Sequence, residues 1–160
     1  MTAVPELRER MVESNVVSDP GISTLPAIFD PVTIANHLRR ALPNEYGTMQ
    51  HLTFHILKHH PGSRCTFEMA METANGWGWV VGKVYAVDRP DVYRTMQEIQ
   101  RAGFGSQDEF SIPKPLAYLH GLRLLLLERV QGPLAKQVFL IGSEPDRTKA
   151  AARCARWLAN

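Results

Sequence analysis

The sequence has 160 residues and a mass of 18.0 kDa, which suits one ordinary domain, or a small lobe with a helical extension, but not two full-sized domains. Hydrophobic residues make up 44% of the chain and charged residues 21%, so a packed core is expected and disorder throughout is excluded. The formal net charge is only +2, which argues against the basic surface that nucleic-acid-binding proteins use to hold phosphates.

The two cysteines and the absence of long apolar runs predict a cytoplasmic protein. Cys65 and Cys154 lie far apart and match no metal-binding or disulfide spacing, as is typical of reduced thiols. No apolar run approaches the roughly 18 residues that a membrane helix needs, and residues 1–14 lack the apolar centre of a signal peptide. We therefore expect neither a nucleic-acid nor a membrane partner.

The N-terminal part of the chain predicts a leader and a helix. Residues 1–26 are polar, and we expect them to be poorly anchored. Asp30 and Pro31 predict a helix start, because aspartate caps free N–H groups and proline fits the first turn. An apolar stripe with a spacing of four continues the helix until Pro43 ends it.

Three strands are predicted after this helix. From Met49 apolar and polar residues alternate, which is the period of a half-buried strand in an antiparallel sheet. The alternation stops at the turn-forming residues 59–63 and then resumes, which predicts a second strand. Asn75-Gly76 favours a type I′ hairpin turn, so a third strand over about 77–87 should pair with the second.

The second half of the chain completes an α+β arrangement with one five-stranded antiparallel sheet. The remaining predicted elements are a helix over about 91–102, strands over 112–119 and 122–130, a short helix near 134–139 and a longer helix from about 145 onward.

The third predicted strand contains an unusual lysine. Between Glu72 and Asp88 the only charged residue is Lys83, and neither set of alternating residues in this strand is polar. An ammonium group between apolar neighbours loses hydration, which a carboxylate or an anionic ligand must replace. The alternative is an edge lysine whose amine reaches water along its own apolar stem.

A carboxylate follows Lys83 on the next predicted helix. Glu98 lies at the edge of that helix's apolar stripe, fifteen residues beyond Lys83. The alternative is a surface glutamate that pairs with Arg94 or Arg101 and contributes only about 0.3–0.5 kcal/mol. A strand lysine, a helix with a carboxylate on its inner edge and two further strands form the arrangement of a kinase small lobe.

Five segments in this order resemble the N-terminal part of the aminoglycoside phosphotransferase and choline-kinase-like family. The resemblance covers about residues 30–160 and implies a protein-kinase-like small lobe over 27–130, followed by a linker and the first helices of the large lobe over 131–160. The matching segments are LKHHPGSRC (57–65), VGKVY (81–85), RAGF (101–104), IPKPL (112–116) and LLERVQG (126–132).

The resemblance implies an ATP site made largely of backbone and two charged side chains. Lys83 takes the position of the family's phosphate-binding lysine, and Glu98 that of its partner on the helix. The carbonyl of Glu128 and the N–H of Val130 would contact the purine, with Leu127 as the buried residue before them.

The phosphate loop is the weakest part of the resemblance. Protein-kinase phosphate loops have several glycines, so that successive N–H groups can approach the phosphates. Here the corresponding turn has Gly62 alone, next to Pro61, which has no N–H. Ser63 and Arg64 are the candidates for phosphate contacts.

Catalytic residues are not expected within this chain. Phosphoryl transfer requires a carboxylate that accepts the hydroxyl proton and Asp or Asn ligands for Mg²⁺. In the family these come from a His-x-Asp-x-x-x-x-Asn run and a later Asp in the large lobe, and the sequence has no such run. We therefore expect the ATP-binding part of a longer or divided phosphotransferase, inactive alone, which leaves open whether its acceptor is an aminoglycoside, choline, homoserine or another alcohol.

Two further interpretations of the sequence bear on its function. One is a kinase-like module without catalytic function, for interaction or regulation, in which apolar surface left without a second lobe drives homodimer formation. The other is a metal site at His51, His55 and His59, which repeat at a spacing of four. On a strand these side chains are spread along the sheet, and no nearby Cys or carboxylate completes a site, so no metal is predicted.

Overall fold

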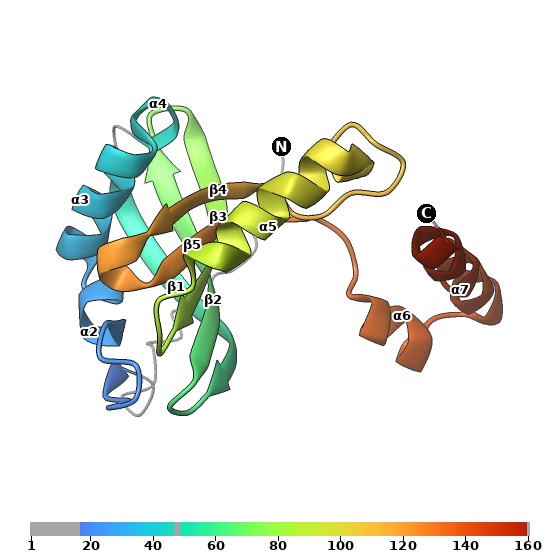
Figure 1. Ribbon diagram of the computed structural model, residues 1–160, viewed down its shortest axis with the longest axis horizontal. Coiled ribbons are helices and arrows are strands. Elements are labelled where there is room, and N and C mark those ends of the chain that lie inside the picture. The colour runs from blue at the N-terminus through green and yellow to red at the C-terminus, as the bar shows by residue number, and fades with distance from the viewer. Residues whose placement is uncertain (1–16, 47–48, 160) are drawn as a thin grey trace. The chain divides into compact units, whose positions relative to one another are not determined.

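The computed structural model describes residues 17–46 and 49–159. It divides into two compact units, the first ending at Arg129 and the second beginning at Val130. The first unit holds an antiparallel sheet with helices on it, and the second holds two helices (Figure 1).

The helices before the sheet are α2 (Leu25–Ile28), α3 (Pro31–Ala41) and α4 (Pro43–Tyr46). Asp30 caps α3 as predicted, because its carboxylate accepts a hydrogen bond from the Thr33 N–H at 2.8 Å. The leader over residues 1–26 was expected to be poorly anchored, and the part of it that the structure describes contradicts this expectation. Ile22 and Leu25 are fully buried, so this segment is part of the core; its first sixteen residues lie outside the described residues.

The sheet has five antiparallel strands in the order β1-β2-β3-β5-β4, which confirms the predicted α+β class. The strands are β1 (Met49–His60), β2 (Arg64–Thr73), β3 (Gly76–Tyr85), β4 (Pro115–Leu119) and β5 (Leu124–Glu128). The β2–β3 hairpin forms next to the predicted dipeptide: Thr73 pairs with Gly76, so the two turn residues are Ala74 and Asn75. Of these three positions only Gly76 has a positive φ, +103°, so the turn is not of the predicted type I′, which needs a positive φ at both central residues.

Helix α5 (Pro90–Ile99) and a π-helical turn (Gln100–Phe104) connect β3 to β4, and a 3₁₀ turn (His120–Leu122) connects β4 to β5. The last two strands are shorter than predicted. Pro113 and Pro115 lack the N–H that a strand ladder uses, and the 3₁₀ turn includes Leu122, which was predicted to begin the last strand.

One side of the sheet, here called the core face, packs against α2 and α3. Phe67 at its centre makes edge-to-face contacts with Phe29 and Phe54, at centroid distances of 5.1 and 6.1 Å. A Cβ added at Gly82 would collide with the Phe67 ring, so glycine allows the ring to lie on β3. The fully buried side chains of this face include Cys65, Phe67, Met69 and Met71 of β2, Val80 and Val84 of β3, and Leu124 and Leu126 of β5.

The other side of the sheet, here called the lysine face, carries the intervening residues of the same strands. Helix α5 packs against β4 (Figure 1), and the hydroxyl of Tyr118, a β4 residue on this face, contacts the start of α5. The lysine face includes Arg64, Thr66 and Glu68 of β2, Val81, Lys83 and Tyr85 of β3, Tyr118 of β4, and Leu125 and Leu127 of β5.

The second unit contains α6 (Ala135–Ile141) and α7 (Glu144–Ala159), which pack on each other. Neither helix contains a buried residue. In the described part of the chain, no helix combines the length and the apolar character needed to cross a membrane.

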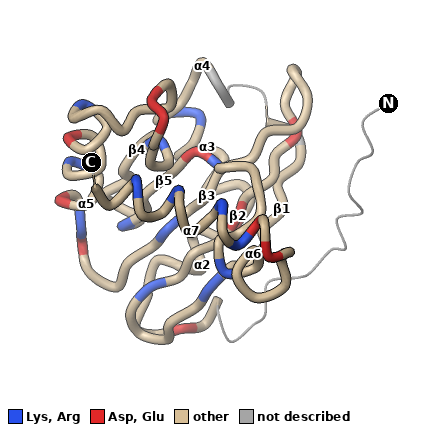
Figure 2. Tube along the Cα trace, turned by 90° about the vertical axis from the view of Figure 1, so that its right-hand side faces the viewer, with Lys and Arg blue, Asp and Glu red and all other residues tan. Residues whose placement is uncertain are grey.

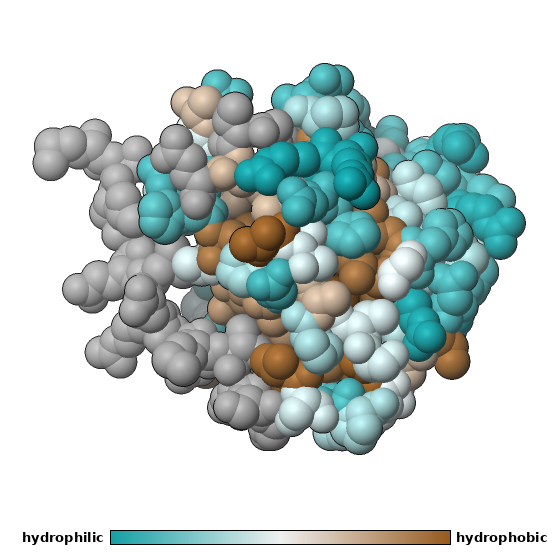
Figure 3. All heavy atoms as spheres, turned by 90° about the vertical axis from the view of Figure 1, so that its left-hand side faces the viewer, coloured by the Kyte–Doolittle hydropathy of each residue, from teal (hydrophilic) through white to brown (hydrophobic). Residues whose placement is uncertain are grey.

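Charge and hydropathy are mixed on the surface. Lys and Arg positions are interspersed with Asp and Glu positions (Figure 2), in keeping with the small net charge. Hydrophilic and hydrophobic side chains also lie side by side where the first unit is viewed from the side of α2 and α3 (Figure 3). The charges that suggest a function are therefore a local cluster rather than a whole surface.

Candidate functional site

Lys83 lies in β3, the central strand of the sheet, between Thr66 of β2 and Leu125 of β5. The side chain is half-buried, and its Nζ lies 5.6 Å from the centroid of the Tyr85 ring. Among the ion pairs that the described residues form, none involves Lys83. The ammonium has thus lost part of its hydration without gaining a carboxylate.

The charges of two arginines act on this lysine. Burial lowers the pKa of Lys83, and the charges of Arg64 and Arg89 lower it further. The Arg89 guanidinium is paired with Asp91, with Nη2 and Nε 2.8 and 2.9 Å from its carboxylate oxygens. Among the described residues the Arg64 guanidinium has one hydrogen bond, to the His60 ring at 3.5 Å, and neither Arg64 nor Lys83 forms an ion pair with a carboxylate.

Tyr85 adds a buried hydroxyl beside Lys83 and Arg64. It lies opposite Arg64 in the β2–β3 ladder and is only 8% exposed. Burial raises the pKa of its hydroxyl, which has no hydrogen-bond partner among the described residues. Buried polar groups are almost always paired with protein, water or a ligand, so this hydroxyl is an unused polar group next to Lys83.

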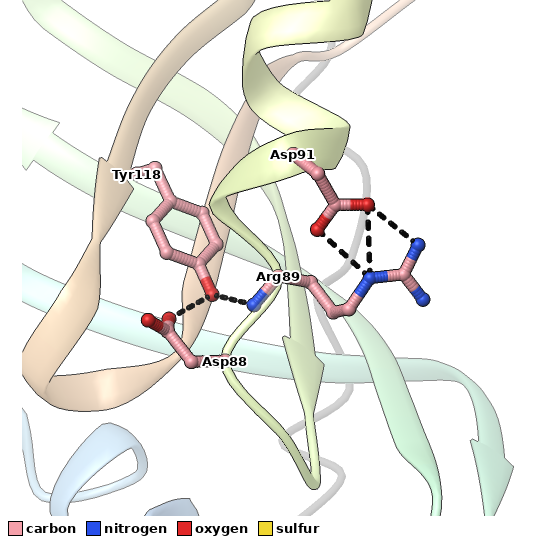
Figure 4. A network of polar contacts seen from close by, with 4 residues as sticks. All are labelled: Asp88, Arg89, Asp91 and Tyr118. Atoms are coloured by element: carbon pink, nitrogen blue, oxygen red, sulfur yellow. Dashed lines mark hydrogen bonds and ion pairs between the residues drawn. The ribbon is translucent and has the colours of Figure 1, made fainter.

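A hydrogen-bond network fixes the start of α5 on the lysine face (Figure 4). The Tyr118 hydroxyl donates to Asp88 Oδ1 and accepts from the Arg89 N–H, both at 2.7 Å. Burial, together with the neighbouring Asp88 carboxylate, raises the pKa of Tyr118 to about 12. The hydroxyl therefore stays protonated and holds the β3–α5 connection, with Arg89, against β4.

The turn between β1 and β2 offers side chains rather than backbone to a ligand. Gly62 has a φ of +69°, and its N–H donates to Asp19 Oδ2 at 2.8 Å. The Ser63 N–H donates to the His60 carbonyl at 3.0 Å, and Pro61 has no N–H. The candidates from this turn are thus the exposed side chains of Ser63 and Arg64, not a cradle of free N–H groups.

The expected pair between Lys83 and Glu98 is not formed in this structure. Glu98 is exposed on α5 and takes part in no ion pair among the described residues, including the alternative pairs with Arg94 and Arg101. The reason is the docking of the helix. No residue of α5 is buried, and Ile99 of its apolar stripe remains 37% exposed, so the carboxylate stays in solvent.

The residues expected at the purine lie at the end of the first unit and the start of the second. Leu127 is half-buried opposite Val81, and the Glu128 N–H donates to the Lys114 carbonyl at 2.9 Å. Val130 is exposed at the start of the second unit. The purine contacts stay a prediction.

Sequence reasoning missed two contributors to this region. Asp19 lies in the predicted leader, and the turn-forming sequence Asp-Pro-Gly that it begins is the one local signal that could have suggested an ordered segment there. Arg129 forms an ion pair with Glu68, and its guanidinium lies 5.7 Å from the Trp79 ring centroid, at the edge of the lysine face. Neither contact has a signal in sequence spacing.

Metal ligation and similarity to other proteins give no further information on the site. Among residues 17–46 and 49–159, no three His, Cys, Asp or Glu side chains gather in a way that could hold a metal ion. His51 contacts Glu72 at 3.2 Å, and His59 contacts Asp19 at 2.8 Å. Comparisons with protein-family models, curated proteins and solved structures find no match to this chain.

Proposed function

We propose that this chain is the nucleotide-binding part of a small-molecule phosphotransferase, which transfers a phosphoryl group from ATP to a hydroxyl group. Lys83 binds the triphosphate in this proposal, and Arg64 and Ser63 contribute from the adjoining turn. The catalytic carboxylate and the Mg²⁺ ligands lie outside these 160 residues, so the chain binds nucleotide but does not turn it over.

The observation that carries the proposal is the half-buried ammonium of Lys83, which has no carboxylate partner in the described part of the chain and whose pKa is lowered by the charges of two arginines. Such a group is stabilised by an anion with more than one negative charge. The position of Lys83 in the central strand, before the helix that leads to β4, supports a kinase-like small lobe.

Anion and nucleotide titrations test the proposal. Isothermal titration with inorganic pyrophosphate, ATP with Mg²⁺, and adenosine should detect binding of the first two ligands. Lys83→Met should weaken both by about tenfold or more, the equivalent of one charge-assisted hydrogen bond. Lys114→Met, which removes a charge from an exposed position outside the strands, should leave both affinities unchanged.

Two outcomes would contradict the proposal. Equal affinities in the wild type and in Lys83→Met would remove the role assigned to the lysine. No binding of pyrophosphate or ATP at millimolar concentration would favour the alternative, a kinase-like module with an interaction or regulatory function. That alternative has its own observation: exposed large apolar side chains on α6 and α7, among them Leu140, Ile141 and Leu158.

A further inference from the structure

Asp19 is a buried carboxylate that joins the chain before α2 to the turn between β1 and β2. Its side chain is 5% exposed, and it accepts hydrogen bonds from the Gly21 N–H at 2.9 Å and the Gly62 N–H at 2.8 Å. His59 Nε2 lies 2.8 Å from the oxygen that also binds Gly62. These contacts hold the pKa of Asp19 below its usual value, so the group is ionised at neutral pH.

The backbone around Asp19 fits the turn as closely as the carboxylate does. A Cβ added at Gly21 would collide with the backbone of Gly62, so the missing side chain of Gly21 allows the two segments to touch. Ile22, the next residue, is fully buried in the core and anchors the segment from its other side. Residues 19–22 therefore form a fixed support for the turn.

The support continues through the turn to the lysine face. The Ser63 carbonyl accepts a hydrogen bond from the Ala86 N–H at 2.8 Å, which ties the turn to the chain just after β3. Arg64 follows directly, begins β2 and lies opposite Tyr85. The position of the turn thus sets where the Arg64 guanidinium lies relative to Lys83.

We propose that Asp19 is a positioning residue, which holds the turn at residues 61–63 and thereby keeps Arg64 next to Lys83 on the lysine face. The expected effect of Asp19 on anion affinity rests on the function proposed above, because Arg64 and Lys83 bind the anion there. The expected effect of Asp19 on the pKa of Lys83 does not, because the charges of Arg64 and Lys83 repel each other without a ligand.

A double-mutant cycle separates positioning from a general loss of stability. Asp19→Asn replaces one of the two carboxylate oxygens by an amide NH₂ group, which cannot accept a hydrogen bond. At least one backbone N–H of Gly21 or Gly62 then loses its acceptor, so the turn should lose its support. If Asp19 acts through Arg64, Asp19→Asn and Arg64→Gln should each weaken pyrophosphate binding by about tenfold. The double variant should bind no more weakly than Arg64→Gln alone.

A second readout needs no ligand. The charge of Arg64 lowers the pKa of Lys83, so Arg64→Gln should raise this pKa, as followed by NMR of the lysine side chain. Asp19→Asn should raise it in the same direction, and the double variant should show no further rise. Asp30→Asn, at the exposed cap of α3, is the matched control and should leave both readouts unchanged.

The outcomes distinguish this inference from the proposed function. Additive losses of affinity, or a Lys83 pKa that Asp19→Asn leaves unchanged, would overturn the positioning role even if the protein binds nucleotide. Absence of pyrophosphate binding in the wild type would contradict the proposed function. The positioning role of Asp19 would then be tested by whether Asp19→Asn raises the pKa of Lys83. If Asp19→Asn does not fold, His59→Gln can replace it in the double-mutant cycle. This variant removes the contact of the His59 ring with Asp19 and keeps the hydrogen bond from Gly62, so we expect a smaller rise in the pKa of Lys83.

Discussion

The two faces of the sheet are made by alternate residues of the same strands, yet they serve different ends. In β3, Val80 and Val84 are fully buried on the core face, while Lys83, between them in sequence, is half-buried on the lysine face. The core face is closed by α2 and α3, and its fully buried strand side chains are apolar. The lysine face holds Lys83, Arg64 and a hydroxyl without a hydrogen-bond partner among the described residues, under a helix with no buried residue.

The comparison assigns stability to the core face and the proposed ligand binding to the lysine face. Apolar burial is the main favourable contribution to folding, so the core face accounts for the stability of the sheet. A partly desolvated cation without a carboxylate opposes folding, so its presence on the lysine face needs another reason. Substitutions on the two faces should therefore differ in size and even in sign.

The largest expected effect is on the core face. Leu126→Ala should lower the free energy of unfolding by about 2–5 kcal/mol, because a fully buried leucine leaves a cavity when truncated. Leu127→Ala is the matched control, one residue further along β5 and half-buried on the lysine face, and its loss should be clearly smaller. Denaturant unfolding followed by circular dichroism measures both, and equal losses would mean that the two faces do not differ as described.

A smaller effect is expected from adding a methyl group to the core face. Gly82→Ala should destabilise by about 1–3 kcal/mol, because the new Cβ meets the Phe67 ring, which must then shift within a packed core. Gly121→Ala adds the same group where no atom lies within 4 Å, and should change stability by no more than about 0.5 kcal/mol. A thermal melt in which Gly82→Ala matches the wild type would show that the ring moves freely.

The smallest effect, of opposite sign, is expected on the lysine face. Lys83→Met should unfold with a free energy equal to or greater than that of the wild type at pH 7, because it removes a desolvated charge. The folded-state pKa of Lys83 is lower than its usual value of 10.5, so the folded protein releases this proton at a lower pH than the unfolded chain. The free energy of unfolding of the wild type should therefore rise with pH between these two values, and the advantage of Lys83→Met should shrink.

Denaturant titrations at several values between pH 7 and pH 10 check this sign. Lys114→Met, at an exposed position, controls for the general loss of one positive charge. A stability advantage of Lys83→Met that grows as the pH rises would contradict the environment described for Lys83.

Features set by neighbours in sequence could be predicted. The alternation after Met49 located β1 and β2, Asn75-Gly76 located the hairpin, and Asp30-Pro31 located the start of α3. Each depends on interactions within a few residues, so the sequence pattern contains the whole physical cause.

Features that depend on tertiary packing could not be predicted. Asp19 contacts Gly62 across 43 positions, and a polar segment gives no sign that its carboxylate will accept a hydrogen bond from an N–H group so far away in the sequence. The pairing of Lys83 with Glu98 depends on how deeply α5 docks, which the apolar stripe of a helix does not determine. The position of Lys83 between apolar neighbours was predictable, and Arg64 was already a candidate for the same site; the effect of Arg89 on Lys83 was not predictable.

The bond between Asp19 and Gly62 also has a consequence for selectivity. Since the amides of the turn are already occupied, an anion that reaches the lysine face from this turn meets the long, exposed side chain of Arg64 instead of a rigid ring of dipoles. Attraction of this kind is screened over about 8–10 Å in physiological salt, so its strength should depend steeply on ionic strength. It should also follow the valence of the anion more than its shape, so that sulfate competes with phosphate of equal charge.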